Sequence, residues 1–243
     1  MRFLKFLAFT ALASSLQFPL ATPATAGVFS VTPVRIFMTP RDRGVAITLT
    51  NEGDTEVALQ ADINAWTQKP DGTDELVLTD EMILSPPSLK LAPNARQVVR
   101  LALLRPIDPS RQLTYRMVIR EVPEATAPKE RAMEMPVALA LSMPVFITPP
   151  SAKAQIACQV LRKSAAEIST ACENTGTAYG QIREITIKRG EQNLARFEGG
   201  SYILPGASKI IPLKAEKPIA AGAAELKVVF DDGKNQTTSV IVP

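Results

Sequence analysis

Histidine is absent from this chain of 243 residues. Without it, Ser-His-Asp and Cys-His catalysis are excluded, and the commonest metal ligand is missing. An enzyme would then depend on paired carboxylates or on a lysine, and the sequence contains no constellation that calls for either. We therefore expect no catalytic residues, no metal site, no cofactor and no small-molecule substrate.

The chain also lacks a large excess of charge of either sign, and it has few aromatic side chains. The chain carries 27 basic and 24 acidic residues, a formal net charge of +3. It has no Lys/Arg run and no basic tail, so binding to nucleic acid has no electrostatic basis. One Trp and three Tyr are few for a site that would stack sugars.

A long uninterrupted apolar run is missing as well, although the chain starts with apolar residues. Arg2 and Lys5 lead into the apolar stretch 6–12, and the small residues ATA follow at 24–26. This order is typical of a secretory signal peptide, whereas a membrane anchor needs a longer run. We expect residues 1–26 to be removed on export, which leaves 25 basic and 24 acidic residues.

Only two cysteines are present, Cys158 and Cys172. They lie on the two sides of a predicted hairpin whose turn centres near Ala165, and symmetric counting about that turn places them opposite each other. In an exported chain such a pair suggests a disulfide, which would contribute about 3 kcal/mol by closing this loop. Two buried, unpaired thiols are the other interpretation, and both make the cysteines structural.

After the first residues, the sequence consists of short alternating or apolar runs separated by turn residues, a pattern typical of a β-sandwich or barrel. In the first half, strands are predicted at 44–50, 57–67, 89–91, 97–104 and 113–122. In the second half, strands are predicted at 155–161, 167–172, 181–189, 194–197, 208–213, 225–231 and 237–242.

The run TPPS at 148–151 interrupts this pattern and is interpreted as an interdomain linker. The block on each side has the length and the number of short strands that suit an immunoglobulin-like sandwich. We therefore predict an all-β protein with two tandem immunoglobulin-like domains, at 27–149 and 150–243. Trp66, in the second predicted strand, is expected to lie in the core.

The segment 134–147 carries the most specific pattern. Its odd positions hold large apolar side chains and its even positions are mostly small residues or proline, which predicts a strand with one apolar face. Pro136 and Pro144 both occupy even positions, so both missing N–H groups lie on one edge, as an edge strand tolerates. The free stretch 138–142 would then be a template for pairing with another chain. An ordinary buried sandwich strand is the other interpretation.

Motifs along the mature chain are similar to those of a known family. They are SPP at 85–87, LAPNA at 91–95, VVRL at 98–101, YRMVIREVP at 115–123, and the weaker FSV at 29–31, AW at 65–66, ENTG at 173–176 and LPG at 204–206. In this order and spacing they resemble the "PP…L-x-P-G-x…V-R", "Y/F-x-x-x-x-R-E-I-P" and "N-P/T…L-x-P" motifs of the periplasmic pilus chaperones of the PapD type. The similarity spans essentially the whole mature chain.

The resemblance implies a boomerang-shaped periplasmic chaperone that is not an enzyme. It also implies that the segment 134–147 is lent to a pilus subunit (a pilin) that lacks its own final strand, which is donor-strand complementation. Met135, Val137, Leu139 and Leu141 would then fill the groove of the subunit, at roughly 1.5 to 3 kcal/mol each before ordering costs. An outer-membrane usher would be the second partner, and self-association of the free protein stays open.

The family also binds the terminal carboxylate of the subunit with two basic residues in the cleft between the domains. Arg35 matches the first of them. At the second, where a lysine is expected, this chain has Pro144, which cannot bind a carboxylate and indicates a divergent branch. The resemblance thus implies either that Arg35 acts with another cation, for which Arg100 is the candidate, or that the subunit is held differently.

A different class of protein is also compatible with the pattern. An exported structural or adhesive β-sandwich protein, either a fibre subunit or a glycan-binding module, would share the signal peptide and the strands. A fibre subunit should begin with an alternating extension, and the mature start GVFSV at 27–31 offers only a short one. The few aromatic residues disfavour the glycan-binding module.

Overall fold

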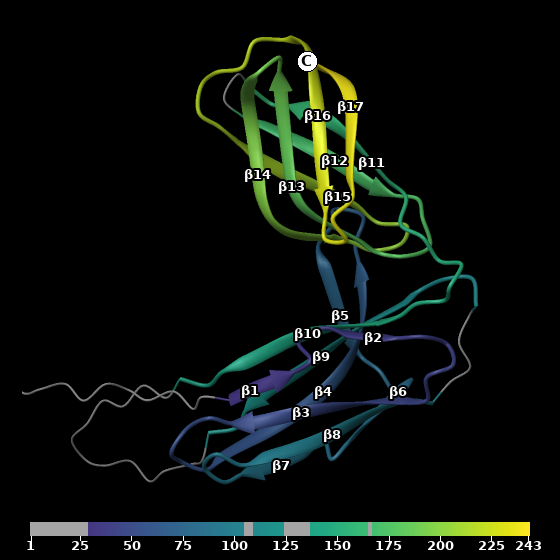
Figure 1. Ribbon diagram of the computed structural model, residues 1–243, viewed down its shortest axis with the longest axis vertical. Helices are drawn as coiled ribbons and strands as arrows, with labels where there is room; N and C mark the ends of the chain where they lie inside the picture. Colours follow the sequence, from purple (N-terminus) through teal and green to yellow (C-terminus); the bar gives the residue numbers. More distant parts are fainter. Residues whose placement is uncertain (1–28, 105–108, 124–136, 165–166) are drawn as a thin grey trace, which may run out of the picture.

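Two β-sandwich domains that meet at an angle make up the protein. The structure is a computed structural model, and it describes residues 29–104, 109–123, 137–164 and 167–243. Figure 1 shows the first domain, β1 to β10, below the second domain, β11 to β17. The described residues form strands, turns and loops without a helix, and so none of them forms a helix suited to crossing a membrane. The all-β fold with two immunoglobulin-like domains is confirmed.

Two sheets form the first domain. The four-stranded sheet has the order β1-β3-β8-β6, and the larger sheet has the order β2-β10-β9-β4-β5, with β7 also paired to β4. The bounds in the smaller sheet are β1 Phe29–Thr32, β3 Gly44–Asn51, β6 Met82–Ser85 and β8 Arg96–Leu103. Those in the larger sheet are β2 Ile36–Met38, β4 Val57–Gln68, β5 Asp74–Leu78, β7 Ser88–Leu91, β9 Leu113–Glu121 and β10 Ala140–Ile147.

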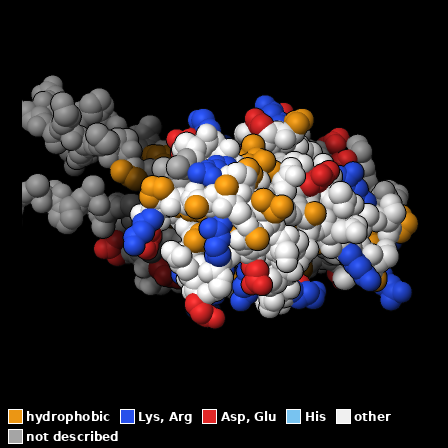
Figure 2. All heavy atoms as spheres, turned by 90° about the horizontal axis from the view of Figure 1, so that it is seen from above, with side chains coloured by type: hydrophobic (Ala, Val, Ile, Leu, Met, Phe, Trp, Pro, Cys, Tyr) orange, Lys and Arg blue, Asp and Glu red, His pale blue; other side chains and the backbone are white. Residues whose placement is uncertain are grey.

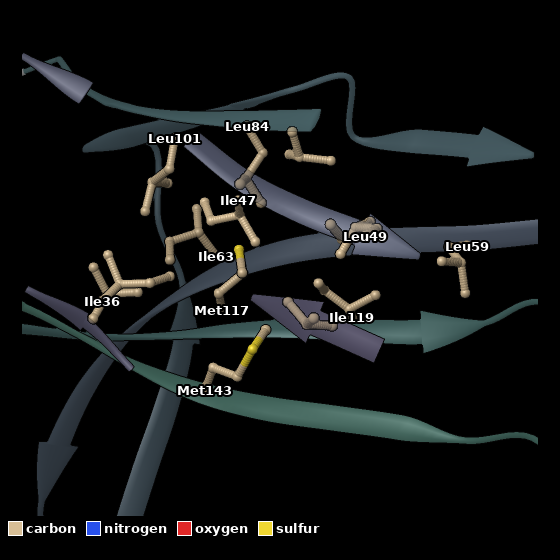
Figure 3. Close-up of a cluster of buried hydrophobic side chains, with 14 of the residues drawn as sticks. Ile36, Ile47, Leu49, Leu59, Ile63, Leu84, Leu101, Met117, Ile119 and Met143 are labelled. Atoms are coloured by element: carbon tan, nitrogen blue, oxygen red, sulfur yellow. The ribbon is translucent and has the colours of Figure 1, made fainter. Parts of the chain in front are cut away.

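The apolar positions of these strands face each other between the two sheets. Figure 3 shows side chains from the smaller sheet, such as Ile47 and Leu101, against side chains from the larger sheet, such as Ile63, Met117 and Met143. Ile47, Leu101 and Met117 have no exposed surface. Alternation along each strand produces this layer, because every second side chain of a strand points to the same face.

One sheet that folds over itself forms the second domain. Its order is β11-β12-β15-β14-β13-β16-β17, and β15 pairs with β12 over most of its length but with β14 only at Ala215 and Lys214. The two layers thus enclose a second core. The bounds are β11 Ile156–Arg162, β12 Ile168–Asn174, β13 Gly180–Arg189, β14 Gln192–Ile203, β15 Ser208–Ala215, β16 Gly222–Phe230 and β17 Asn235–Val242.

The hairpin of β4 and β5 extends from the first domain to the second (Figure 1). Gln68 at the end of β4 donates to the carbonyl of Tyr202 and accepts from the backbone N–H of Leu204. Gly72 at the turn has φ +81°, and a Cβ there would lie 3.0 Å or less from atoms of Ser208 and Lys209. Glycine is required at this tip because both the backbone conformation and the close approach exclude a side chain.

The sequence predicted most strands but not β1, β2, β5 or β6. β2 has three residues, too few for a periodic signal. All five residues of β5 are exposed, so that no buried face imposes an alternation on them. The predicted strand 194–197 is part of the longer β14, which continues through GGS at 199–201, residues that usually mark a strand end.

Candidate functional site

β10 is an interior strand in its second half and an edge strand in its first half. It pairs with β9 along its whole length, from Ala140 opposite Arg120 to Ile147 opposite Leu113. β2 covers its other side only from Val145 onward. The prediction of an edge strand through residue 147 is therefore corrected: the open edge ends at Pro144, because β2 occupies the edge beyond it.

Backbone directions show which groups face the open edge. The carbonyl of Leu139 accepts from the backbone N–H of Glu121 on the side of β9, and the backbone N–H of Thr148 donates to the carbonyl of Met38 on the side of β2. Along a β-strand, the backbone groups of successive residues point to opposite edges, so those of every second residue share one edge. The N–H groups of Ala140 and Ser142 therefore point away from β9, toward the open edge.

The odd-numbered side chains of this segment point into the sandwich. Val145 is fully buried in the first core, while Leu139 and Leu141 are partly buried against it. Val137 is 60% exposed, and it precedes the strand, which begins at residue 140. Met135 lies outside the described residues. Exposed apolar area thus remains next to the open edge. The groove-filling role of Met135, Val137, Leu139 and Leu141 stays a prediction.

Arg35 directly precedes β2 and contacts the second domain. Its Nη1 donates to Oδ2 of Asp231 at 3.1 Å, and its Nη2 donates to Oε1 of Gln181 at 2.7 Å. Ile36 is the partner of Val145 in the parallel pair, so continuation of this register places Arg35 beside Pro144. The open edge of β10 therefore ends at a guanidinium group.

Arg100 does not join this site. It lies on β8 between Ala46 and Ser85, in the four-stranded sheet. Its neighbours Val99 and Leu101 are fully buried in the core, so the exposed side chain of Arg100 points from the opposite, outer face. The structure gives no support to Arg100 as the second anchor, since it belongs to a sheet that does not contain β10.

Arg116, which sequence reasoning missed, is close to the expected position. It lies opposite Pro144 in the β9–β10 register. Its guanidinium carbon is 3.8 Å from the ring centroid of Trp66 and 5.5 Å from that of Tyr202. The guanidinium carbon of Arg35 is 5.9 Å from the same Tyr202 ring, so two cations flank one tyrosine. Burial lowers the pKa of Arg116, and the carboxylate of Asp74 opposes this effect.

Aromatic rings fill the junction between the domains. Phe146 of β10 stacks on Tyr179 of the second domain, with ring centroids 3.9 Å apart, and Trp66 packs edge-on against Tyr202. Trp66 is buried as predicted, but it packs with the core of the second domain. The Tyr179 hydroxyl donates to Asp231 at 3.2 Å. Burial and then the negative charge of Asp231 raise the pKa of Tyr179 above its ordinary value.

Gln112 connects the same junction with hydrogen bonds. Its Nε2 donates to Oγ1 of Thr148 at 2.6 Å, and its Oε1 accepts from the backbone N–H of Tyr179 at 2.7 Å. The residue is 4% exposed. Burial of this amide is tolerated because both of its ends are satisfied. It fixes the start of β9 and the end of β10 to the second domain.

A cleft of about 1000 Å³ lies beside this junction, with Phe37 on one side and Tyr179, Asp231 and Lys234 on the other. Its lining is partly apolar and carries charges of both signs. Within the described ranges, no group of three or more Cys, Asp or Glu side chains could hold a metal ion. Seen from the end of the second domain, basic and acidic side chains are interspersed (Figure 2).

Cys158 and Cys172 form a disulfide that links β11 to β12. The two residues are direct partners in the register of these strands, with Cα atoms 4.0 Å apart. Cys172 has no exposed surface. The predicted turn at Ala165 lies outside the described residues. The pair belongs to the core of the second domain and is remote in the fold from the open edge of β10.

Comparison with known proteins shows what the chain is similar to. Residues 28–153 match the family described as pili and flagellar-assembly chaperones, PapD N-terminal domain. No curated protein matches the chain. Solved structures with the same fold are the CsuC chaperone complex from Acinetobacter baumannii (TM-score 0.64, 16% identity, 88% of this chain and 98% of that one), CupB2 from Pseudomonas aeruginosa (0.57, 17%, 88% and 100%), and the SafB–SafA complex from Salmonella enterica (0.59, 16%, 91% and 98%). At these low identities, the structural similarity shows a shared fold and nothing further.

Proposed function

This chain belongs to the family of pili and flagellar-assembly chaperones, and from that premise we propose that it captures pilus subunits along the open edge of β10. Two of the similar structures are described as a chaperone with a tip adhesion subunit and a chaperone with a pilin. Subunits of this kind are the partner proposed for this chain. Donor-strand complementation is the form of strand addition that the family uses.

The observation that carries the proposal is the shared edge of β10. β2 occupies this edge from Val145 onward, in parallel orientation. A strand added along 140–143 would occupy the vacant half of the same edge and pair with the N–H groups of Ala140 and Ser142. Leu141 and Leu139 would contribute apolar surface to the joint core, since they already face the open side of the sandwich.

The position of Arg35 indicates the direction of the added strand. If that strand runs parallel to β10, as β2 does, its C-terminal end arrives where β2 begins. A terminal carboxylate would then meet the guanidinium of Arg35, which forms strong charge-assisted hydrogen bonds with carboxylates. Arg116 supplies a second positive charge near the position where Pro144 replaces the expected lysine.

The cellular setting follows from the family and from the sequence. We infer that residues 1–26 direct export, that the protein acts in the periplasm, and that it passes its subunits to an outer-membrane usher. It acts by binding and is not an enzyme. We propose domain limits of 27–149 and 150–243, and the end of β10 at Ile147 and the start of β11 at Ile156 support this division.

Ser142→Pro tests the role of the open edge. Proline removes the N–H that points to the open edge and places a ring there, while the odd-numbered residues keep their pairing with β9. We expect recovery of a pilus subunit, co-expressed from the same gene cluster and co-purified from the periplasm, to fall at least five-fold, the equivalent of about one hydrogen bond.

Ser142→Ala is the matched control, because it changes the same side chain and keeps the N–H. It should retain full recovery, and circular dichroism should show that both variants are folded. Undiminished capture by a folded Ser142→Pro variant would refute strand addition along β10.

A further inference from the structure

The side chain of Arg35 is held by the second domain. The residue lies between β1 and β2, outside any strand. Its guanidinium donates hydrogen bonds to Asp231, which directly follows β16, and to Gln181 of β13. A residue proposed to bind the subunit from the first domain is therefore already bound to a carboxylate of the second.

Asp231 resembles the proposed ligand chemically. Its carboxylate contacts Nη1 of Arg35 at 3.1 Å, which is the contact that a terminal carboxylate would make. The side chain of Asp231 is 17% exposed and that of Arg35 is 35% exposed, so solvent and an incoming group can reach the pair. The neighbouring Asp232 differs, because it pairs with Lys234.

We propose that Asp231 competes with the terminal carboxylate of the subunit for the guanidinium of Arg35. This inference rests on the proposed function. Two carboxylates at one guanidinium repel each other, so a subunit can bind fully only when Asp231 moves aside or shares the cation. Asp231 thereby weakens the anchor, and when the subunit leaves, it binds Arg35 again.

This arrangement suits a chaperone that must release what it binds. An anchor with a fully free guanidinium would bind the terminal carboxylate more tightly and lengthen the lifetime of the complex. The internal carboxylate offers a replacement partner at the moment of release, so Arg35 is not left without a counter-ion. Asp231 is thus a residue that sets the specificity and strength of the carboxylate anchor.

The test compares two forms of one peptide. The probe is a fluorescent seven-residue peptide of alternating threonine and valine, made with a C-terminal carboxylate and with a C-terminal amide. The affinity of each form is measured by fluorescence anisotropy at low salt, and the ratio of the two affinities isolates the anchor. A merely structural change would alter both affinities and leave the ratio unchanged.

Asp231→Asn removes the charge but retains an oxygen that can accept from the Tyr179 hydroxyl. We expect it to raise the carboxylate-to-amide ratio roughly five-fold, a size typical of one partly exposed ion pair. Asp232→Asn, the matched control, should leave the ratio unchanged. In an Arg35→Ala background, Asp231→Asn should have no effect, because the competitor acts only through Arg35.

The outcomes separate the two ideas. A ratio that stays the same or falls in Asp231→Asn, while Arg35→Ala lowers it, would overturn competition by Asp231 and leave the anchor in place. A ratio that Arg35→Ala does not change would overturn the anchor itself.

Discussion

Pro144 of β10 lies directly opposite Arg116 of β9. Pro144 stands where the resemblance to the family predicts a lysine, and β9 places the cation of Arg116 opposite it. Stacking on Trp66 at 3.8 Å holds the guanidinium in place. A positive charge therefore lies near the end of the open edge although the residue on β10 is proline.

The first prediction concerns this cation. Arg116→Met keeps much of the apolar packing on Trp66 but removes the charge, so subunit recovery should fall several-fold and depend less on salt. Co-purification at low and moderate ionic strength measures both effects. Arg100→Met is the control, since it removes an equal charge from the outer face of the other sheet. Equal recovery from the two variants would contradict a role for Arg116.

The second prediction concerns Tyr179 and pH. The pKa of its phenol is raised in the folded state, by burial and by Asp231. The unfolded chain has a phenol pKa of about 10. The stability that the protonated phenol contributes is therefore complete below about pH 10 and is lost as the pH rises further.

Tyr179→Phe should remove that dependence. It should cost about 1 kcal/mol at pH 8, because the hydrogen bond to Asp231 is lost while the ring still stacks on Phe146. Between pH 10 and pH 11, the free energy of unfolding measured in urea should fall less steeply in the variant than in the wild type. Parallel curves over that range would show that Tyr179 titrates normally.

The third prediction concerns Gln112. Gln112→Leu should lower the free energy of unfolding by about 2 kcal/mol, because Thr148 and Tyr179 each lose a buried hydrogen-bond partner. It should also increase the radius of gyration measured by small-angle X-ray scattering, since the hydrogen bonds of Gln112 that hold the two domains together are lost. Gln97→Leu, at an exposed position of β8, is the control. An unaltered radius would show that the aromatic contacts alone hold the domains.

The fourth prediction concerns the disulfide. Reduction of the bond between Cys158 and Cys172 should lower the free energy of unfolding by roughly 3 kcal/mol, because the closed loop restricts the unfolded chain. Urea unfolding with and without dithiothreitol measures the difference. The stability of a Cys158→Ala/Cys172→Ala variant should not respond to the reductant. A wild type equally stable in both states would contradict the expected contribution.

Several features of the site could be read from the sequence because they depend on local pattern. Alternation in β10 predicts which side chains face the core, and the two prolines predict which edge is free. The pairing of Cys158 with Cys172 follows from symmetry about a short connection. Such features can be predicted without a structure because residues close together along the chain determine them.

The partner of Arg35 could not be read in the same way. Arg35 and Asp231 are 196 residues apart, and no local pattern relates positions in two domains. The register that places Arg116 opposite Pro144 could not be predicted either. Many residues separate β9 from β10 in the sequence, and no two-residue turn fixes their pairing. Arg100 was predicted from its residue type, and only the structure shows that it lies in the sheet that does not contain β10.

By itself, the sequence determined that this is an all-β protein of two sandwich domains with a proline-marked strand edge, because hydrophobic alternation and turn residues act over short distances. Tertiary structure alone decided where that edge ends, because β2 pairs with β10 from Val145 onward. It also decided which charged side chains lie there. Those charges come from β9, from the start of β2 and from the second domain, and only the packing of the two domains brings them together.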